Sequence, residues 1–137
     1  MLTIPEHFLA VRYDRSRYPG APGVSGVADG ANCQQLAYEL LRHFGFTVPD
    51  LRSSELWDDT EHTTRAETLE PFDLLLFSPD DSAFGAHVGV YLGDGKVIHL
   101  SKEAGVPEVR ELAWFRDAPH YRTLLGGKRC RKWEGRS

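Results

Sequence analysis

The pattern of apolar and polar residues predicts one amphipathic helix near the start of the chain. Apolar residues recur three and four positions apart, at the spacing of one helix face: Leu36, Ala37, Leu40, Leu41 and Phe44. Asn32 stands at the expected N-cap, Gln35 follows three residues later as in a capping box, and Gly45 stands at the expected C-terminal cap. The helix is therefore predicted to begin at Cys33.

Short apolar segments after this helix predict a mostly antiparallel sheet. The uninterrupted apolar run 72–77 predicts a buried strand. Segments 87–92 and 96–100 predict a hairpin, because Gly93-Asp94-Gly95 between them is a turn signal. Segments 106–112 and 121–125 predict two further strands.

The remaining segments predict connections within one small domain. Residues 14–31 are rich in glycine and proline, and residues 52–70 are polar and acidic, so both predict loops. We expect an α+β fold spanning residues 1–137, with a core from about 10 to 129 and a basic C-terminal tail at 128–137.

Charge and hydropathy narrow the classes of partner. The net charge is −4 although five of the last ten residues are basic, so the body of the chain is acidic and argues against a nucleic-acid partner. No apolar run is long enough to cross a membrane, and Met1–Tyr13 lacks the apolar core of a signal peptide. We therefore expect a cytoplasmic protein, with export by a non-Sec route as the alternative.

Cys33 is the candidate nucleophile. Unpaired N–H groups and the positive end of the dipole at a helix N-terminus favour a thiolate, and the same groups can stabilise an oxyanion. Two alternatives stay open: a buried structural cysteine, or a disulfide with Cys130, the other cysteine, which would silence the thiol. The two cysteines form no CxxC motif.

The predicted hairpin carries two candidate partners for this thiol, His87 and His99. With a two-residue Asp94-Gly95 turn, Val90 opposes His99 and His87 points to the other face. With a three-residue loop, Gly89 opposes His99, and His87 becomes its diagonal neighbour on the same face. The second arrangement lets one histidine act as base while the other orients it, with the opposite face uniformly apolar. Two surface histidines without a role are the alternative.

A zinc site built from Cys33 and the histidines is a weaker hypothesis. The sequence has no HExxH, CxxC or HxH spacing, so such a site would have to assemble from distant single residues. We therefore expect no metal and no cofactor.

Three segments resemble the NlpC-type cysteine peptidases, cell-wall hydrolases with a minimal papain-like fold. Residues 30–36 resemble the family's Gly-rich loop that ends in Asp-Cys-Ser-Gly at a helix start, and residues 70–77 resemble its Pro-Gly-Asp-Leu strand. Residues 87–99 closely match its His-Val-Gly-hydrophobic-Tyr-Leu-Gly-x-Gly hairpin, which ends in hydrophobic-His. The resemblance runs from about residue 10 to 129. It implies a cysteine-bearing helix, the N-terminal one, packed on the sheet.

The resemblance also implies roles for individual residues. Cys33 is expected to be the nucleophile, His87 the base and His99 the orienting residue. Tyr13, with Tyr18 as its rival, resembles the family's active-site tyrosine. Asn32 replaces the family's aspartate, and Gln34-Gln35 replaces its Ser-Gly, so we expect Asn32 and Gln34 to contact substrate without a carboxylate to pair with an ammonium group.

The expected activity is hydrolysis of a small peptide or amide bond by Cys33, His87 and His99. A γ-glutamyl or murein-type amide is the first substrate class, but the loss of the carboxylate at Asn32 makes another amide a serious possibility. An amidase or acyltransferase for a specialised metabolite, and an exported effector toxin that cuts wall peptides, are variants of this prediction. A catalytically silent binding module on the same fold is the alternative.

Overall fold

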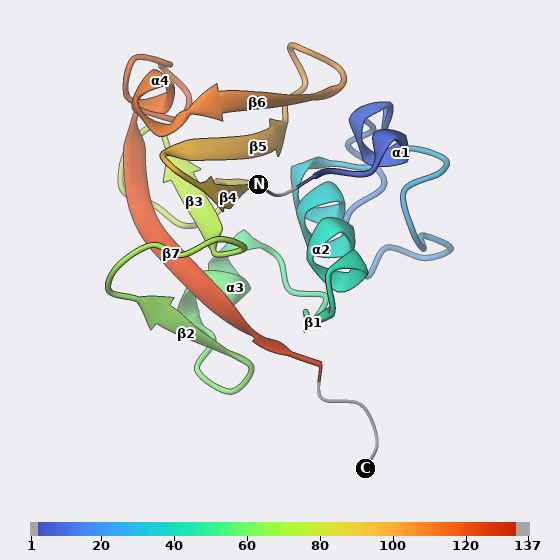
Figure 1. The fold of residues 1–137 in the computed structure, drawn as a ribbon, viewed down its shortest axis with the longest axis horizontal. Coiled ribbons are helices and arrows are strands. Elements are labelled where there is room, and N and C mark those ends of the chain that lie inside the picture. The colour runs from blue at the N-terminus through green and yellow to red at the C-terminus, as the bar shows by residue number, and fades with distance from the viewer. Residues whose placement is uncertain (1–2, 134–137) are drawn as a thin grey trace.

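The computed structural model describes residues 3–133. Its helices and strands follow one another along the chain as Figure 1 shows. The helices are α1 (Glu6–Leu9), α2 (Cys33–His43), α3 (Ser53–Asp58) and α4 (Leu112–Arg116), and the strands are β1 (Phe46–Thr47), β2 (Thr63–Ala66), β3 (Leu74–Ser78), β4 (His87–Gly93), β5 (Lys96–Leu100), β6 (Pro107–Glu111) and β7 (Thr123–Lys132). The chain has the predicted α+β fold.

The strands form a single curled antiparallel sheet. Within residues 3–133 the order is β1-β7-β3-β4-β5-β6, and β2 also pairs with β7. Every pairing between these strands is antiparallel. Helix α2 lies on one side of the sheet, against β4 and β5, while α4 lies at the opposite end of the molecule (Figure 1).

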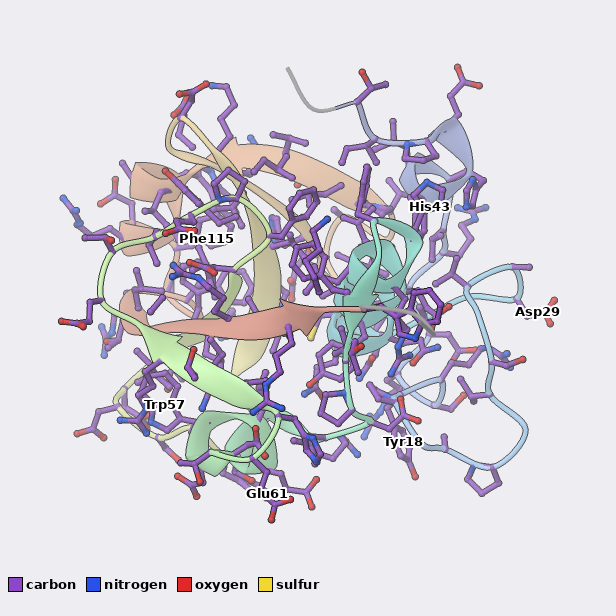
Figure 2. The ribbon with its side chains drawn as sticks, turned by 60° about the horizontal axis from the view of Figure 1, so that its bottom comes forward. Tyr18, Asp29, His43, Trp57, Glu61 and Phe115 are labelled. Carbon is purple, nitrogen blue, oxygen red and sulfur yellow. The ribbon has the colours of Figure 1, made fainter. Side chains whose placement is uncertain are left out.

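The sequence of strand β3 is uninterruptedly apolar over residues 74–77 because both faces of the strand are buried. Leu74 and Leu76 belong to the larger core cluster beneath α2, whereas Leu75 and Phe77 belong to a smaller cluster that includes Phe115 of α4. In Figure 2, Phe115 lies at the sheet end of the molecule, away from His43 at the end of α2. A strand covered on both sides needs no polar alternation.

Helix α2 begins at Cys33, as the periodicity predicts. The Asn32 side chain accepts a hydrogen bond from the Gln35 backbone N–H at 2.8 Å, a cap typically worth about 1 kcal/mol. The reciprocal half of the expected capping box is absent, because the Gln35 side chain donates instead to the Gly26 carbonyl at 3.0 Å. Helix α2 is the second helix of the chain, since the one-turn helix α1 precedes it.

The prediction of a plain loop over residues 52–70 is wrong. This segment contains α3 and β2, and the buried Lys128 ties it to the sheet by donating to the carbonyls of Trp57 (3.2 Å) and Asp59 (2.6 Å). Figure 2 shows Trp57 of α3 beside β2. Helix α4 is likewise absent from the prediction, since its five residues are too short to show a helical period.

The predicted basic tail is also wrong where the structure describes it. Strand β7 extends to Lys132, so residues 128–132 are part of the sheet. Arg129 helps to hold this segment in the sheet, because its guanidinium donates two hydrogen bonds to the buried Asp73 carboxylate, each at 2.8 Å. Residues 134–137 of the predicted tail lie outside the described residues.

The hairpin β4–β5 has the register that places His87 and His99 on one face, but its turn differs from the predicted three-residue loop. Asp94 and Gly95 form a two-residue turn, with φ values of +53° and +75°. A bulge between Tyr91 and Gly93 then shifts the pairing by one residue, so that Val90 opposes Ile98. The three-residue loop is therefore wrong, but the register that it predicts is right.

Candidate active site

Cys33 lies at the first turn of α2, against the start of β4. It is a free, partly exposed cysteine, and the backbone N–H groups of Val88, Gln34 and Cys33 itself point toward its thiol. Cys130 is also free and lies buried in β7, so the structure does not contain the disulfide that would silence Cys33. The contact with Val88 places the thiol beside the residue that follows His87.

His87 and His99 meet across the hairpin, on the face opposite α2. The distance between His87 Nε2 and His99 Nδ1 is 2.8 Å, and the two rings are perpendicular. Gly89 makes this approach possible: a Cβ there would lie 2.8 Å from Val97 Cγ1 and 3.4 Å from His99 Cβ. Since His87 Nε2 faces His99, the nitrogen of His87 left for another partner is Nδ1.

Desolvation keeps both histidines neutral at physiological pH. Desolvation, with a smaller contribution from the charge of His99, lowers the pKa of His87 to about 3. Burial also lowers the pKa of His99 to about 4, although the Glu108 carboxylate opposes the shift. A neutral imidazole has a free lone pair, so His87 can accept a proton without first losing one.

The sign of the shift at Cys33 differs from the expectation. Desolvation raises the pKa of the thiol, and the surrounding backbone N–H groups and the Arg52 charge oppose this rise without reversing it. Burial thus outweighs the helix terminus that was predicted to favour the thiolate. The resting pair is therefore a neutral thiol beside a neutral imidazole.

Tyr121 completes the histidine side of the site, and the sequence prediction missed it. Its ring stacks on His87 with centroids 4.3 Å apart, and its hydroxyl donates to Glu103 Oε1 at 3.3 Å. The His99 ring packs against Phe115 and Trp114 at centroid distances of 4.8 and 5.7 Å. The sequence places Tyr121 at the start of the predicted strand 121–125, but in the structure it lies in a turn between α4 and β7. Nothing in that apolar segment indicated a contact with His87.

On its other side, Cys33 borders an open groove of about 740 Å³. Tyr13 and Tyr18 both line it, so the two rival tyrosines share the same space. Arg15 and Arg52 line it as well, and neither was predicted. Its lining residues are Tyr13, Arg15, Ser16, Tyr18, Asn32, Cys33, Gln34, Arg52, Ser53, Gly85 and Ala86.

Asn32 and Gln34 reach the groove but are already engaged within the protein. Asn32 caps α2 and is only 7% exposed. The Gln34 side chain is 3% exposed, donates to the Leu51 carbonyl at 3.4 Å and accepts from Arg52 Nε at 3.3 Å. Their expected contacts with substrate stay predictions.

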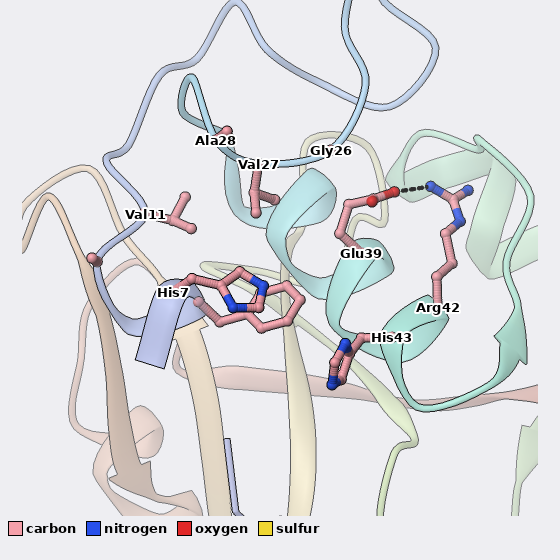
Figure 3. A pocket seen from close by; sticks show the side chains of 10 residues that line it. His7, Val11, Gly26, Val27, Ala28, Glu39, Arg42 and His43 are labelled. Atoms are coloured by element: carbon pink, nitrogen blue, oxygen red, sulfur yellow. Dashed lines mark hydrogen bonds and ion pairs between the residues drawn. The ribbon is translucent and has the colours of Figure 1, made fainter. Parts of the chain in front are cut away.

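A second cavity, of about 670 Å³, lies at the opposite end of α2 (Figure 3). His7 and His43 line it with ring centroids 6.1 Å apart, but Glu39 beside them is paired with Arg42 at 2.7 Å. Nowhere in residues 3–133 do three or more His, Cys, Asp or Glu side chains gather as a metal site would require. This cavity therefore offers neither a nucleophile nor a set of metal ligands.

Comparison with known proteins gives the family to which this fold belongs. The family model of the NlpC/P60 family matches residues 19–122. The chain belongs to the NlpC/P60 family, whose members are cysteine peptidases or amidases and typically act on peptidoglycan. A comparison with curated proteins finds no match.

Solved structures share the fold at low sequence identity. An NlpC/P60 family protein from Bacillus cereus ATCC 10987 is 22% identical with a TM-score of 0.60, over 89% of this chain and 36% of that one. The peptidoglycan hydrolase RipB from Mycobacterium tuberculosis is 20% identical with a TM-score of 0.59, over 93% of this chain and 61% of that one. The NlpC/P60 domain of the peptidoglycan hydrolase SagA is 18% identical with a TM-score of 0.55, over 80% and 85%.

The chain is shorter than several of these relatives. It spans 36% of the Bacillus cereus protein and 61% of RipB. In the part of the chain that the structure describes, no helix has the length and apolar character of a membrane span.

Proposed function

We propose that the chain is a thiol-dependent amide hydrolase that cleaves a small peptide or a murein-type, γ-glutamyl-like amide bond. Cys33 is the nucleophile, His87 the base and His99 the residue that orients it. The observation that carries this proposal is the meeting of Cys33 with the start of β4, where His87 is held by His99 at 2.8 Å. Membership of a family of cysteine peptidases and amidases supports it.

The first half-reaction joins thiol attack to proton transfer. As the Cys33 sulfur bonds to the substrate carbonyl carbon, its proton passes to Nδ1 of the neutral His87. This step requires His87 to donate its Nε2–H to His99 Nδ1, which lies 2.8 Å away, because that tautomer leaves Nδ1 of His87 free. A neutral resting pair fits this order of events, because the thiol is activated only when substrate is present.

Backbone N–H groups at the start of α2 suit the developing oxyanion. Asn32 caps the N–H of Gln35 with its side chain and that of Leu36 with its carbonyl. The N–H groups of Cys33 and Gln34 face the thiol instead, close to where the oxyanion forms. The imidazolium of His87 then protonates the leaving amine, and the remaining thioester is hydrolysed by water with His87 again as base.

The direct test measures the alkylation rate of each cysteine by iodoacetamide against pH, under reductant, by peptide mass spectrometry. We expect Cys33 to react faster than Cys130, which is 5% exposed and whose pKa burial raises to about 12. His87→Ala should slow Cys33 and leave Cys130 unchanged. The exposed His120 provides the matched control, since His120→Ala should change neither rate.

Turnover on a panel of muropeptides tests the substrate class. Cleavage that disappears in Cys33→Ala supports the proposal, and the product identifies the bond. If Cys33 is no more reactive than Cys130 and no amide is cleaved, the hydrolase proposal is wrong. Cleavage of other amides but of no muropeptide would instead indicate an amidase or acyltransferase for a different metabolite.

One observation favours the alternative of a binding module. The raised pKa of Cys33 makes the resting thiol less reactive than an isolated cysteine. A module of this kind would bind its peptide with the same affinity in wild type and Cys33→Ala and would release no product. Isothermal titration of both proteins with each muropeptide distinguishes the two functions.

A further inference from the structure

The groove beside Cys33 is positively charged although the protein is acidic overall. Arg15 and Arg52 line it, and its lining contains no aspartate or glutamate. The net charge of the chain is −4. Two carboxylates of the same segments are hydrogen-bonded to residues of the lining, since Asp14 accepts from the Ser16 hydroxyl at 2.7 Å and Glu55 from the Arg52 backbone N–H at 2.8 Å. Neither forms an ion pair with the Arg15 or Arg52 guanidinium in the described part of the chain.

The side chain of Arg52 is held in place by neutral partners only. Its guanidinium carbon lies 4.2 Å from the centroid of the Tyr18 ring, and its Nε donates to Gln34 Oε1 at 3.3 Å. Within residues 3–133 its two terminal nitrogens make no hydrogen bond or ion pair. An oriented guanidinium with both terminal nitrogens free matches the two oxygens of a carboxylate.

The hollow on the other side of the histidines provides the contrast. It measures about 380 Å³ and contains Glu103, Glu108 and Arg110. There Arg110 pairs with Glu108 at 3.2 Å, and Glu103 accepts from Tyr121. The arginine beside the histidines is thus paired with a carboxylate, whereas Arg15 and Arg52 form no ion pair in the described part of the chain.

The position of the groove indicates which part of a substrate enters it. The leaving amine must lie against His87 to receive its proton, and His87 does not line the groove. The acyl part of the substrate, on the other side of the scissile carbonyl, is the part that can extend along Asn32 and Arg52. Asn32 offers no negative charge there to an ammonium group.

We propose that Arg15 and Arg52 select amide substrates whose acyl part carries a free carboxylate. This inference rests on the proposed hydrolase function, because it assigns the acyl part by its distance from His87. Arg52 binds the carboxylate through its two terminal nitrogens, and Arg15 adds a second positive charge. The resulting preference is for an anionic acyl group over an ammonium-bearing one.

Two alkylating reagents of nearly equal size test the groove without any turnover. Iodoacetate carries a carboxylate and iodoacetamide does not, so the ratio of their rates at Cys33 reports binding of the anion and cancels the intrinsic reactivity of the thiol. We expect this ratio to be about tenfold higher in the folded protein than in the urea-unfolded chain, as a charge-assisted hydrogen bond provides. Arg52→Gln and Arg15→Gln should each lower it, and the double variant should return it to the unfolded value.

Arg116→Gln is the matched control, because Arg116 is an exposed arginine of α4 outside this groove. A ratio in the folded protein equal to that of the unfolded chain, or unchanged in the double variant, would overturn the inference. If Cys33 still reacts with iodoacetamide and depends on His87, the proposed function survives that result. If Cys33 reacts with neither reagent, both proposals are wrong.

Three synthetic p-nitroanilides extend the test to catalysis. Their acyl groups have the same length and end in a carboxylate (glutaryl), a carboxamide (glutaramoyl) or an ammonium group (5-aminopentanoyl). Wild type should prefer the carboxylate through a lower KM, and Arg52→Gln should lose about tenfold in kcat/KM for that substrate alone. Equal kcat/KM values for the three anilides would contradict the inference.

Discussion

The N-terminal end of α2 and the hairpin β4–β5 build two halves of the site in opposite ways. Helix α2 presents Cys33 through local interactions, namely one side-chain cap and the free backbone N–H groups of its first turn. The hairpin presents His87 and His99 through a register that extends across two strands and depends on a bulge. The nucleophile therefore depends on a few neighbouring residues, whereas the histidine pair depends on the packing of the sheet.

The two halves also differ in exposure. Cys33 is partly exposed beside a groove with free arginines, and His87 is partly exposed as well, whereas His99 is 1% exposed among aromatic rings. Substitutions on the groove side should consequently change substrate choice with little effect on folding. Substitutions on the hairpin side should change activity and stability together.

The largest effect on activity is expected for His87→Gln. Loss of the base should lower kcat/KM for a cleaved peptide by about 10²–10⁴-fold, the usual contribution of general base catalysis. Circular dichroism should show that the variant is folded, and His43→Gln on the far end of α2 provides a control with unchanged turnover. Retention of wild-type kcat/KM by His87→Gln would show that another group takes the proton.

The pH dependence of stability separates the two desolvated histidines from the carboxylates. The pKa values of His87 and His99 are lowered to about 3 and about 4, below the ordinary 6.5, so the unfolded chain binds protons that the folded protein excludes. Stability is thus fully present above pH 6.5 and falls as the pH drops toward 4, by about 1.4 kcal/mol per pH unit for each proton. The pKa values of Asp14, Asp59 and Asp80 are lowered from 3.8, so the stability that these carboxylates contribute is lost only as the pH falls below about 3.8.

Urea denaturation at several pH values between 4 and 7 measures this dependence. The double variant His87→Gln/His99→Gln should have a much shallower slope than wild type, because it has no buried imidazole to charge. His120→Gln should keep the wild-type slope. A free energy of unfolding that does not change between pH 7 and 4 would contradict the lowered pKa values of the two histidines.

Gly89→Ala tests the register directly, with an expected loss of about 1–3 kcal/mol for overpacking. The added methyl would lie 2.8 Å from Val97 Cγ1 and 3.2 Å from the Ile98 carbonyl, so β5 must move away. We expect the histidines to separate and kcat/KM to fall along with the midpoint of urea unfolding. Gly105→Ala, at a glycine whose Cβ would meet nothing within 4 Å, reports the cost of its positive φ alone. If Gly89→Ala matches wild type in both measurements, β5 does not constrain the pair.

Which features of the site could be predicted depends on how far apart in the sequence the residues that determine them lie. The start of α2 could be predicted from Asn32 and the apolar positions that follow it. The His87–His99 pairing could be predicted from alternation along two adjacent strands, because the bulge at Tyr91–Gly93 restored the register that the wrong loop length had given. In both cases the determining residues are close in sequence.

The rest of the site depends on contacts between distant segments. Arg52 and Tyr18 are brought together from two separate connections, and residues 52–70 gave no periodic signal before α3 and β2 formed around Lys128. The predicted direction of the Cys33 pKa shift was wrong for the same reason. Position on the helix can be predicted from the sequence, but the depth of burial depends on the sheet and loops that cover it.

Tyr121 gives the smallest expected effect and the sharpest test of how the histidine side works. Its stacking on His87 at 4.3 Å should be worth about 0.5–1.5 kcal/mol, so Tyr121→Ala should lower kcat/KM about 2–10-fold. Tyr121→Phe keeps the stacked ring and loses only the hydroxyl contact with Glu103, so it should restore most of the activity.

The pH profile distinguishes a positioning role from a merely structural one. Desolvation is the main cause of the low pKa of His87, and the stacked Tyr121 ring covers that imidazole. Removing the ring admits water, which should raise the pKa of His87 toward 6.5 and move the acid limb of kcat/KM to higher pH. Tyr121→Phe should keep the wild-type limb, as should His120→Ala at the neighbouring exposed residue. An acid limb that stays in place in Tyr121→Ala would show that Tyr121 stabilises the fold without tuning the base.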